Sequence, residues 1–327
     1  MDIFGQINGQ DVPAYELRSS GGLTAKVIPW GARLISLRTP SRIGKMAEII
    51  LGHDRLQDYI DHPTYFGATC GRYANRIAGG RYGDVQLDIN EAPNHLHGGT
   101  RGFDKAIWTV ADHGPSHIRL THVSPDGDMG YPGALAASVT YRFEGDDRLI
   151  IEMEATTTAP TVVNLVNHAY FNLKGAGDIL DHQMTVAAEA YAPVGAGLIP
   201  TGALSAVSQT KYDFRQPTRI GDLAGDDGYD HNWCLNTAAA PAVRITEPTS
   251  GRALDLTTNE PGVQIYTCGM MPEGTPGRAG ATYGKFAGLT LETQKYPDSP
   301  NNPAFPSAAL TPGETYRHIM NFRFYTV

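Results

Sequence analysis

Short apolar runs separated by turn-forming residues recur along the whole chain. In residues 23–37, β-forming residues alternate with small residues, and residues 30–32 are predicted to bend the chain between two short strands. In residues 134–157, two apolar-rich runs flank the polar stretch 144–147, which predicts a β-hairpin with a short loop. The pattern is that of strands joined by turns.

The last segment of the chain has a clear period of two. Met320, Phe322 and Phe324 fall on one face of an extended chain, and Asn321 and Arg323 fall on the other. A strand of this kind packs one face on a core and leaves the other in water. The chain is therefore predicted to end in a half-buried strand.

Two further elements are expected before these. Residues 54–61 are predicted to form one or two helical turns, which the pair His62-Pro63 ends because a residue before proline disfavours helical geometry. Residues 161–173 are predicted as another strand, an apolar run interrupted by three asparagines, a histidine and a tyrosine. Helix signals are otherwise scarce.

Composition supports an all-β fold. The 37 glycines and 22 prolines are spread along all 327 residues, which suggests many short elements joined by turns. No fixed repeat or convincing interior boundary is found, although residues 225–229 and 272–284 form glycine-rich loops. Residues 1–327 are therefore predicted as a single domain, a large antiparallel β-sandwich with few short helices.

Charge and motif content exclude several functions. The net charge of −8 and the absence of a Lys/Arg run argue against a nucleic-acid partner. No apolar run has the length of a signal peptide or a membrane span, so a cytoplasmic location is expected. The three cysteines are odd in number and widely spaced, which favours reduced thiols. Phosphate loops, dinucleotide fingerprints and H-E-x-x-H helices are absent, which argues against a kinase, a dehydrogenase or a zincin.

Two costly side chains stand inside apolar runs. His168 interrupts the run 161–173, and Glu292 lies within a run of leucine and threonine. A buried glutamate is expensive unless it is paired or functional, and a buried histidine is more often a satisfied core residue than a catalyst. We therefore expect Glu292 to be functional, while His168 requires a partner before it acquires a role.

Polar clusters elsewhere suit a small hydroxylated ligand. Asn75 and Arg76 lie in the segment 71–77, where they could supply the directional donors that orient such a ligand. Asp230 follows a glycine turn and could either cap that turn or bind a hydroxyl group. A single arginine of this kind could also simply cover apolar surface with its stem.

His95 and His97 offer a metal-dependent alternative. On a strand they would share one face, as the metal ligands of cupin barrels do. The glutamate that usually follows in such sites is missing here, where Gly98 and Gly99 come next. We therefore expect no metal, and His95 could be a structural histidine bonded to turn backbone.

Taken together, these segments resemble the aldose 1-epimerase (galactose mutarotase) family in chain order over nearly the whole sequence. The resemblance rests on Gly-Arg-Tyr-Ala-Asn-Arg-Ile at 71–77, Asn-His-Leu-His-Gly-Gly with Gly-Phe-Asp-Lys in 94–105, Asn-His-Ala-Tyr-Phe-Asn-Leu at 167–173, Tyr-Asp-His-Asn at 229–232, Leu-Glu-Thr-Gln at 291–294 with Pro297-Asp298, and Pro-Gly-Glu-Thr-Tyr at 312–316.

The resemblance implies a galactose mutarotase-like supersandwich that interconverts the α and β anomers of free aldoses without a cofactor or a metal. It implies a small-molecule sugar as the partner and a monomer or homodimer as the assembly. Carried over position by position, the family's general base is Glu292 and its general acid is His168. The implied substrate contacts are Arg76, His97, Asp230, Asn75 and Gln264.

Some positions depart from the family pattern. The chain is a few residues shorter around 82–85, and residues 268–281 differ from the common pattern in a stretch that is expected to line the sugar cleft. Val166 and Ala169 replace hydroxyl residues, and residues 295–296 replace a more usual asparagine and phenylalanine. These departures leave the preferred aldose open, whether hexose, pentose or deoxy sugar.

Charge states complete the expectation. With ordinary pKa values, Glu292 is ionised at neutral pH and can act as a base. A nearby carboxylate readily keeps His168 protonated, so that it can act as an acid. Two alternatives stay open. One is a non-catalytic sugar-binding or sensing protein on the same fold, favoured if the shortened hairpin misplaces Arg76. The other is a metal-dependent cupin-like isomerase that uses His95 and His97.

Overall fold

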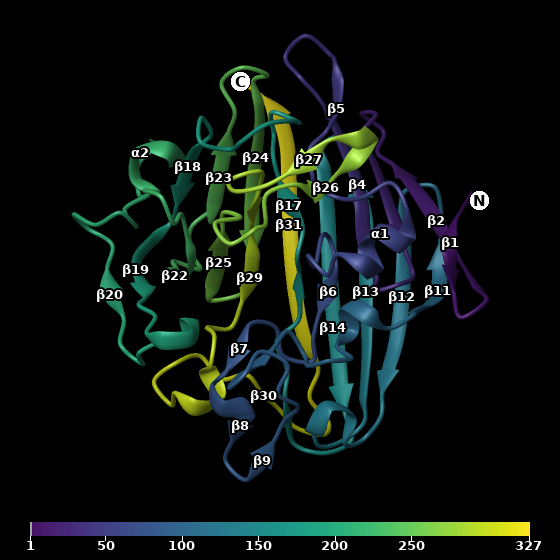
Figure 1. Ribbon diagram of the computed structural model, residues 1–327, viewed down its shortest axis with the longest axis vertical. Coiled ribbons are helices and arrows are strands. Elements are labelled where there is room, and N and C mark those ends of the chain that lie inside the picture. The colour runs from purple at the N-terminus through teal and green to yellow at the C-terminus, as the bar shows by residue number, and fades with distance from the viewer. Residues whose placement is uncertain (1) are drawn as a thin grey trace.

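The computed structural model describes residues 2–327, and every ladder between its named strands is antiparallel (Figure 1). The largest sheet has nine strands. Their order is β11 (Thr109–His113), β12 (His117–Ser124), β13 (Leu135–Glu144), β14 (Arg148–Thr157), β31 (Tyr316–Thr326), β24 (Arg252–Thr258), β23 (Val243–Thr246), β18 (Gln183–Val186) and β21 (Thr218–Arg219).

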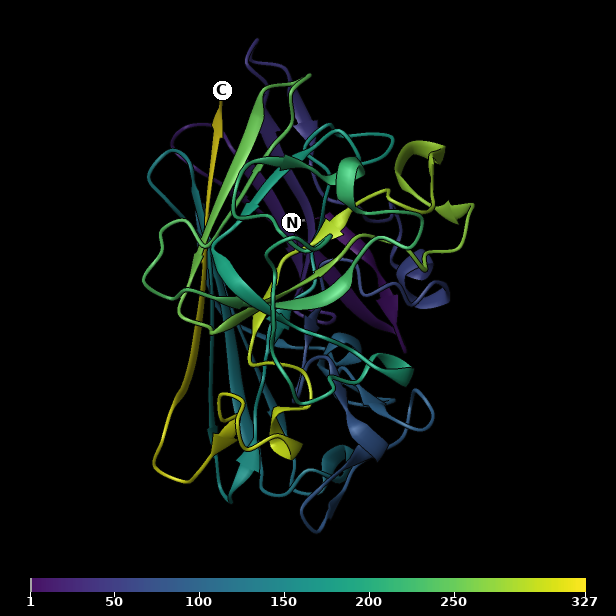
Figure 2. The same cartoon turned by 90° about the vertical axis from the view of Figure 1, so that its left-hand side faces the viewer.

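The fold also contains two five-stranded sheets. The first follows the chain in order: β1 (Asp2–Ile7), β2 (Gln10–Arg18), β3 (Thr24–Ile28), β4 (Arg33–Pro40) and β5 (Met46–Glu48). The second combines distant segments: β20 (Ser205–Ala206), β19 (Ala188–Ala192), β22 (Asp230–Leu235), β25 (Gly262–Tyr266) and β29 (Glu292–Gln294). In Figure 2, β31 runs along one edge of the molecule and most of the chain lies to one side of it.

The remaining elements are short. Six ladders of two residues pair β6 (Thr69–Cys70) with β16 (Val166–Asn167), β7 (Arg76–Ile77) with β10 (His95–Leu96), β8 (Arg81–Tyr82) with β9 (Val85–Gln86), β15 (Thr161–Val162) with β30 (Ala309–Leu310), β17 (Tyr170–Phe171) with β28 (Leu289–Thr290), and β26 (Thr275–Pro276) with β27 (Thr282–Tyr283). The α-helices found within residues 2–327 are α1 (Leu56–Asp61) and α2 (Ile220–Leu223). Neither is long or apolar enough to cross a membrane.

The architecture confirms the all-β prediction and most of the predicted elements. The bend at residues 30–32 separates β3 from β4, and the loop 145–147 joins β13 to β14. Helix α1 ends directly before His62, as expected. In β31, the side chains of Met320 and Phe322 are buried while that of Arg323 faces solvent. Phe322 packs against Phe171 with ring centroids 5.3 Å apart, which joins the large sheet to the layer that carries the site.

The prediction of one strand over residues 161–173 is wrong. The segment forms three two-residue strands, β15, β16 and β17, and each pairs with a different partner. Buried asparagines explain the breaks because their side chains take over backbone hydrogen bonds. The Asn164 amide donates to the Ala74 carbonyl (3.1 Å), and the Asn167 amide donates to the Gly67 carbonyl (3.2 Å) and to the Tyr141 hydroxyl (2.9 Å).

These short ladders bring segments from the whole chain to one place. Strand β16 pairs with β6, and β17 pairs with β28, which leads into β29. Strand β25 lies between β22 and β29, with Gln264 opposite both Asn232 and Glu292. Side chains that are hundreds of positions apart in the sequence therefore converge at the ends of short, buried strands.

Candidate active site

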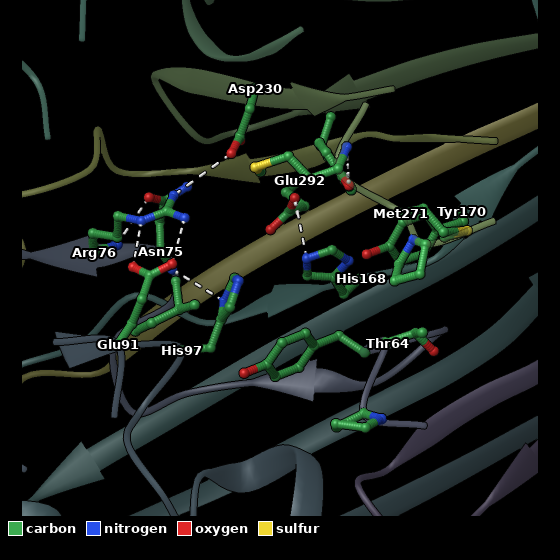
Figure 3. A pocket seen from close by; sticks show the side chains of 16 residues that line it. Thr64, Asn75, Arg76, Glu91, His97, His168, Tyr170, Asp230, Met271 and Glu292 are labelled. Atoms are coloured by element: carbon green, nitrogen blue, oxygen red, sulfur yellow. Dashed lines mark hydrogen bonds and ion pairs between the residues drawn. The ribbon is translucent and has the colours of Figure 1, made fainter. Parts of the chain in front are cut away.

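An open cleft of about 260 Å³ lies where the short strands meet (Figure 3). Six of the seven predicted site residues line it: Asn75, Arg76, His97, His168, Asp230 and Glu292. The seventh, Gln264, does not line the cleft, but its amide donates a hydrogen bond of 2.6 Å to Asp230. The structure thus brings the whole predicted set together.

His168 lies in the short link between β16 and β17. Its backbone N–H donates to the Ala68 carbonyl (2.8 Å), and its own carbonyl accepts from the Gly67 N–H (2.9 Å), so the ring position is fixed by the neighbouring segment. The rings of Tyr65 and Tyr170 stack on the imidazole, with centroids 5.6 and 5.0 Å away. Burial lowers the pKa of His168 to about 3, since a charged imidazole would lose its water.

Glu292 begins β29 at the bottom of the cleft. Its Oε1 lies 3.4 Å from Nε2 of His168 and accepts a hydrogen bond from the Thr290 hydroxyl (2.9 Å), whereas its Oε2 has no partner. Burial raises the pKa of Glu292 to about 8, the Thr290 bond opposes this shift, and the nearby Asp230 charge adds to it. A buried carboxyl oxygen without a partner is a group held ready for a ligand hydroxyl.

The charge states expected for Glu292 and His168 are wrong. The sequence suggested an ionised Glu292 and a protonated His168, but burial shifts both pKa values toward the neutral forms. At neutral pH the pair still holds one proton, and that proton resides on the carboxyl group. The reason is that two uncharged groups lose less solvation than an ion pair in a dry site.

Arg76 forms the polar end of the cleft. Its Nε and one terminal nitrogen donate to the two carboxylate oxygens of Glu91 at 2.6 and 2.8 Å, and its other terminal nitrogen lies 3.6 Å from Asp230. Burial alone would lower the pKa of Arg76, but the bonds to Glu91 and the charge of Asp230 raise it. Arg76 therefore stays cationic and presents fixed donors to the cleft. The sequence reasoning missed Glu91, which lies in a polar loop without a distinctive pattern.

A strained turn positions His97. Asn75 and His97 both adopt the left-handed conformation, with φ of 63° and 49°, and the Asn75 N–H donates to Nδ1 of His97 (3.2 Å). The following Gly98 is also left-handed, and a Cβ there would collide with the Gly71 carbonyl. Because Nδ1 is the acceptor, the neutral imidazole carries its proton on Nε2. Burial holds the pKa of His97 well below its usual value, so the ring remains neutral.

The pair of His95 and His97 that the metal-dependent alternative requires does not form. His95 is buried away from the cleft, and its two ring nitrogens bond to the Asp88 carbonyl and to the Tyr131 hydroxyl, each at 2.6 Å. Potential ligand atoms of His97, His168 and Glu292 do lie within 4.8 Å of one another. However, the proton on Nε2 of His97 gives that nitrogen to the cleft as a donor rather than as a metal ligand.

The departures from the family pattern fall at different distances from the cleft. Of the unusual stretch 268–281, residues 270–272 line the cleft, as expected, and residues 273, 278, 279 and 281 border a second cavity of about 390 Å³. The shortened hairpin β8–β9 does not line the cleft, whereas Arg76 does. Lys295 points away from the cleft to a buried ion pair with Glu260 (2.8 Å).

Comparison with known proteins agrees with this geometry. The family model for aldose 1-epimerase matches residues 13–323. Galactose mutarotase of Mus musculus is 43% identical over 98% of this chain and 97% of its own length. Aldose 1-epimerase of Escherichia coli (strain K12) is 37% identical over 97% of this chain and 96% of its own length.

Solved structures give the same result. The GalM/aldose epimerase homologue from C. elegans superposes with a TM-score of 0.91 at 30% identity, over 97% of this chain and 99% of that chain. Galactose 1-epimerase from Lactobacillus acidophilus NCFM has a TM-score of 0.87 at 27% identity, over 99% and 98% of the two chains. The fold is therefore the galactose mutarotase-like sandwich. With a family model that spans nearly all of its length and a full-length relative at 43% identity, the chain belongs to the aldose 1-epimerase family.

Proposed function

We propose that this enzyme interconverts the α and β anomers of free aldoses, with Glu292 and His168 as its proton-transfer pair. The observation that carries the proposal is the unpartnered Oε2 of Glu292, buried at the bottom of a cleft beside His168. A carboxyl group and an imidazole 3.4 Å apart can reach two oxygens attached to the same carbon. The anomeric carbon of a cyclic aldose carries two such oxygens, the C1 hydroxyl and the ring oxygen.

The reaction needs only proton transfers. Glu292 accepts the proton of the C1 hydroxyl while His168 donates one to the ring oxygen, and the C1–ring oxygen bond breaks to give an aldehyde. Rotation about the C1–C2 bond exposes the other face of the aldehyde. Glu292 then returns a proton to the aldehyde oxygen, and His168 takes one from the attacking hydroxyl.

Burial favours the middle of this cycle. Once the ring has opened, Glu292 is protonated and His168 is neutral, and these are the forms toward which burial shifts their pKa values. The cyclic sugar must draw the proton back to His168, and its C1 hydroxyl can do so by donating to the free Oε2 of Glu292. The site thus stabilises the enzyme form that accompanies the open-chain intermediate.

We assign the substrate contacts to Arg76, His97 and Asp230, with Asn75 and Gln264 acting through them. Arg76 and His97 supply donors, and Asp230 supplies an acceptor whose orientation the Gln264 amide fixes at 2.6 Å. Adjacent ring hydroxyls offer both functions to such a set. Because the similar mammalian proteins are named for galactose, we propose a ring of galactose configuration as the substrate.

The non-catalytic alternative depended on a misplaced Arg76. Arg76 lines the cleft in a bidentate bond to Glu91, so that premise does not hold. The cupin-like alternative required His95 beside His97, and both nitrogens of His95 are engaged elsewhere.

We further propose that the enzyme works in the cytoplasm, since its three cysteines are free thiols, as is usual in a reducing compartment. We propose a monomer or homodimer as its assembly.

Polarimetry on freshly dissolved α-D-galactose tests the function. Glu292→Gln and His168→Ala should each lower the enzymatic rate by about 10² to 10⁴-fold, because each removes one proton-transfer group. Circular dichroism should show both variants folded. The matched controls Glu154→Gln and His117→Ala change partly exposed residues outside the cleft and should leave the rate intact. Near-normal rates in both cleft variants would refute the assignment, and sugar binding without anomer exchange by NMR would indicate a binding protein.

A further inference from the structure

The cleft has two chemically different ends on either side of the catalytic pair (Figure 3). Arg76 and Asp230 lie at one end, beside Glu292, whose pKa responds to both charges. At the other end, Tyr170 stacks on His168 and belongs to the same buried cluster as Met271. Met270 and Pro272 complete the rim of this second end, and the Met270 side chain is largely exposed.

The proton-transfer roles fix how an aldose ring must lie between these ends. The C1 hydroxyl faces Glu292, and the ring oxygen faces His168. In the ring, C2 is bonded to C1, and C5 is bonded to the ring oxygen. The C2 side of the sugar therefore extends past Glu292 toward Arg76 and Asp230, and the substituent on C5 extends past His168 toward the methionines.

The polar groups nearest the second end are partly engaged, and the side chains of Met270, Met271 and Pro272 themselves carry no N–H or O–H group. The Tyr266 hydroxyl accepts a hydrogen bond from the Met270 N–H (3.1 Å), and the Thr64 hydroxyl donates to the His62 carbonyl (3.3 Å). The Met271 N–H donates to the Cys268 carbonyl (3.1 Å). A hydroxyl group placed against Met270, Met271 and Pro272 would lose water to thioether and ring surfaces, whereas a methyl group would gain contact with them.

We propose that Met270, Met271 and Pro272 form the subsite for the C5 substituent and select aldoses with a methyl group at C5, the 6-deoxyhexoses, over those with a hydroxymethyl group. This inference rests on the proposed function, because the orientation of the ring follows from the roles of Glu292 and His168. It answers which aldose the enzyme prefers, a question that the sequence left open.

Three sugars with the same ring configuration isolate the effect. D-galactose, D-fucose and L-arabinose differ only at C5, which carries a hydroxymethyl group, a methyl group or hydrogen. Anomer exchange is followed by polarimetry or NMR, and kcat/KM is compared. D-fucose should be the best substrate, by about tenfold or more over D-galactose, because an apolar pocket discriminates against an added hydroxyl by up to about a hundredfold.

Substitutions in the subsite test its residues. Met271→Gln and the rim variant Met270→Gln keep the side-chain length and add an amide that can bond a hydroxyl, so the D-fucose to D-galactose ratio of kcat/KM should fall by about threefold or more. The ratio does not respond to partial loss of folded enzyme, and Met270 is exposed enough to tolerate the change. Met46→Gln, a partly buried methionine on β5, is the matched control and should leave the ratio unchanged.

The outcomes separate the two proposals. Exchange of all three sugars with D-galactose or L-arabinose as the best substrate overturns the subsite and leaves the mutarotase function intact. A ratio that neither glutamine variant changes also overturns it. Absence of exchange with every sugar contradicts the proposed function itself.

Discussion

Raising the pH above 8 should switch the enzyme off by removing one proton from the Glu292 and His168 pair. In the proposed mechanism the pair must hold a single proton, because ring opening moves a proton onto Glu292 and another one off His168. The two arrangements of that proton interconvert at every pH in a constant ratio. The pH dependence of kcat/KM therefore reports the gain and the loss of a proton by the pair as a whole.

The magnitude follows from the burial of the two groups. The pair loses its proton with a pKa of about 8, set by Glu292, and gains a second with a pKa of about 3, set by His168. At pH 7.5 about three quarters of the maximal kcat/KM should remain, and at pH 9 about one tenth. If the loss of activity were instead set by His168 with its ordinary pKa of 6.5, only about one tenth of the maximal kcat/KM would remain at pH 7.5.

The neighbouring groups His97, Tyr170 and Arg76 do not titrate in the pH range of this fall. Burial keeps the pKa of His97 well below its usual range and that of Tyr170 well above it. Arg76 stays charged through its bonds to Glu91, and burial raises the pKa of Asp230 while the charge of Arg76 opposes that shift. We therefore assign the alkaline limb to the Glu292 and His168 pair.

The assay is polarimetry of α-D-galactose between pH 5 and 9, with the buffer-catalysed rate subtracted at each pH. The expected profile stays near its maximum up to about pH 7, falls to about half at pH 8 and to about one tenth at pH 9. A fall centred near pH 6.5 would refute the reasoning, because it would mean that burial does not shift the pair toward its neutral forms.

Three further predictions concern stability and binding. Glu292→Gln should raise the free energy of unfolding in urea at pH 7 by up to about 3 kcal/mol, because folding must protonate a carboxyl whose ordinary pKa is 4.5, and the gain should vanish near pH 4; an equal gain at both pH values would contradict the raised pKa. Glu91→Gln should raise KM for D-galactose by about fivefold with little change in kcat, since it loosens Arg76, and a selective loss of kcat would instead place Glu91 in the proton transfer. Phe322→Ala should lower the free energy of unfolding by about 3–5 kcal/mol, and a loss below 1 kcal/mol would show that its contact with Phe171 is not part of the core.

The sequence by itself determined the elements whose pattern is local. The alternation of Met320, Phe322 and Phe324 predicted β31, and two apolar runs around residues 144–147 predicted the hairpin of β13 and β14. Local motifs also indicated Arg76, Asp230 and Glu292, because costly polar groups in apolar surroundings stand out in one dimension. The physical reason is that side-chain periodicity and burial cost are properties of neighbouring residues.

Only the tertiary structure decided features that depend on distant segments. The asparagines of residues 161–173 break that run because their partners lie near Gly67 and Ala74, about a hundred positions away. His95 and His97 separate because the left-handed backbone at His97 ends the alternation of the strand. The charge of the Glu292 and His168 pair depends on how much water all the surrounding strands exclude. Solvent exclusion is a property of the assembled cleft, and no local pattern encodes it.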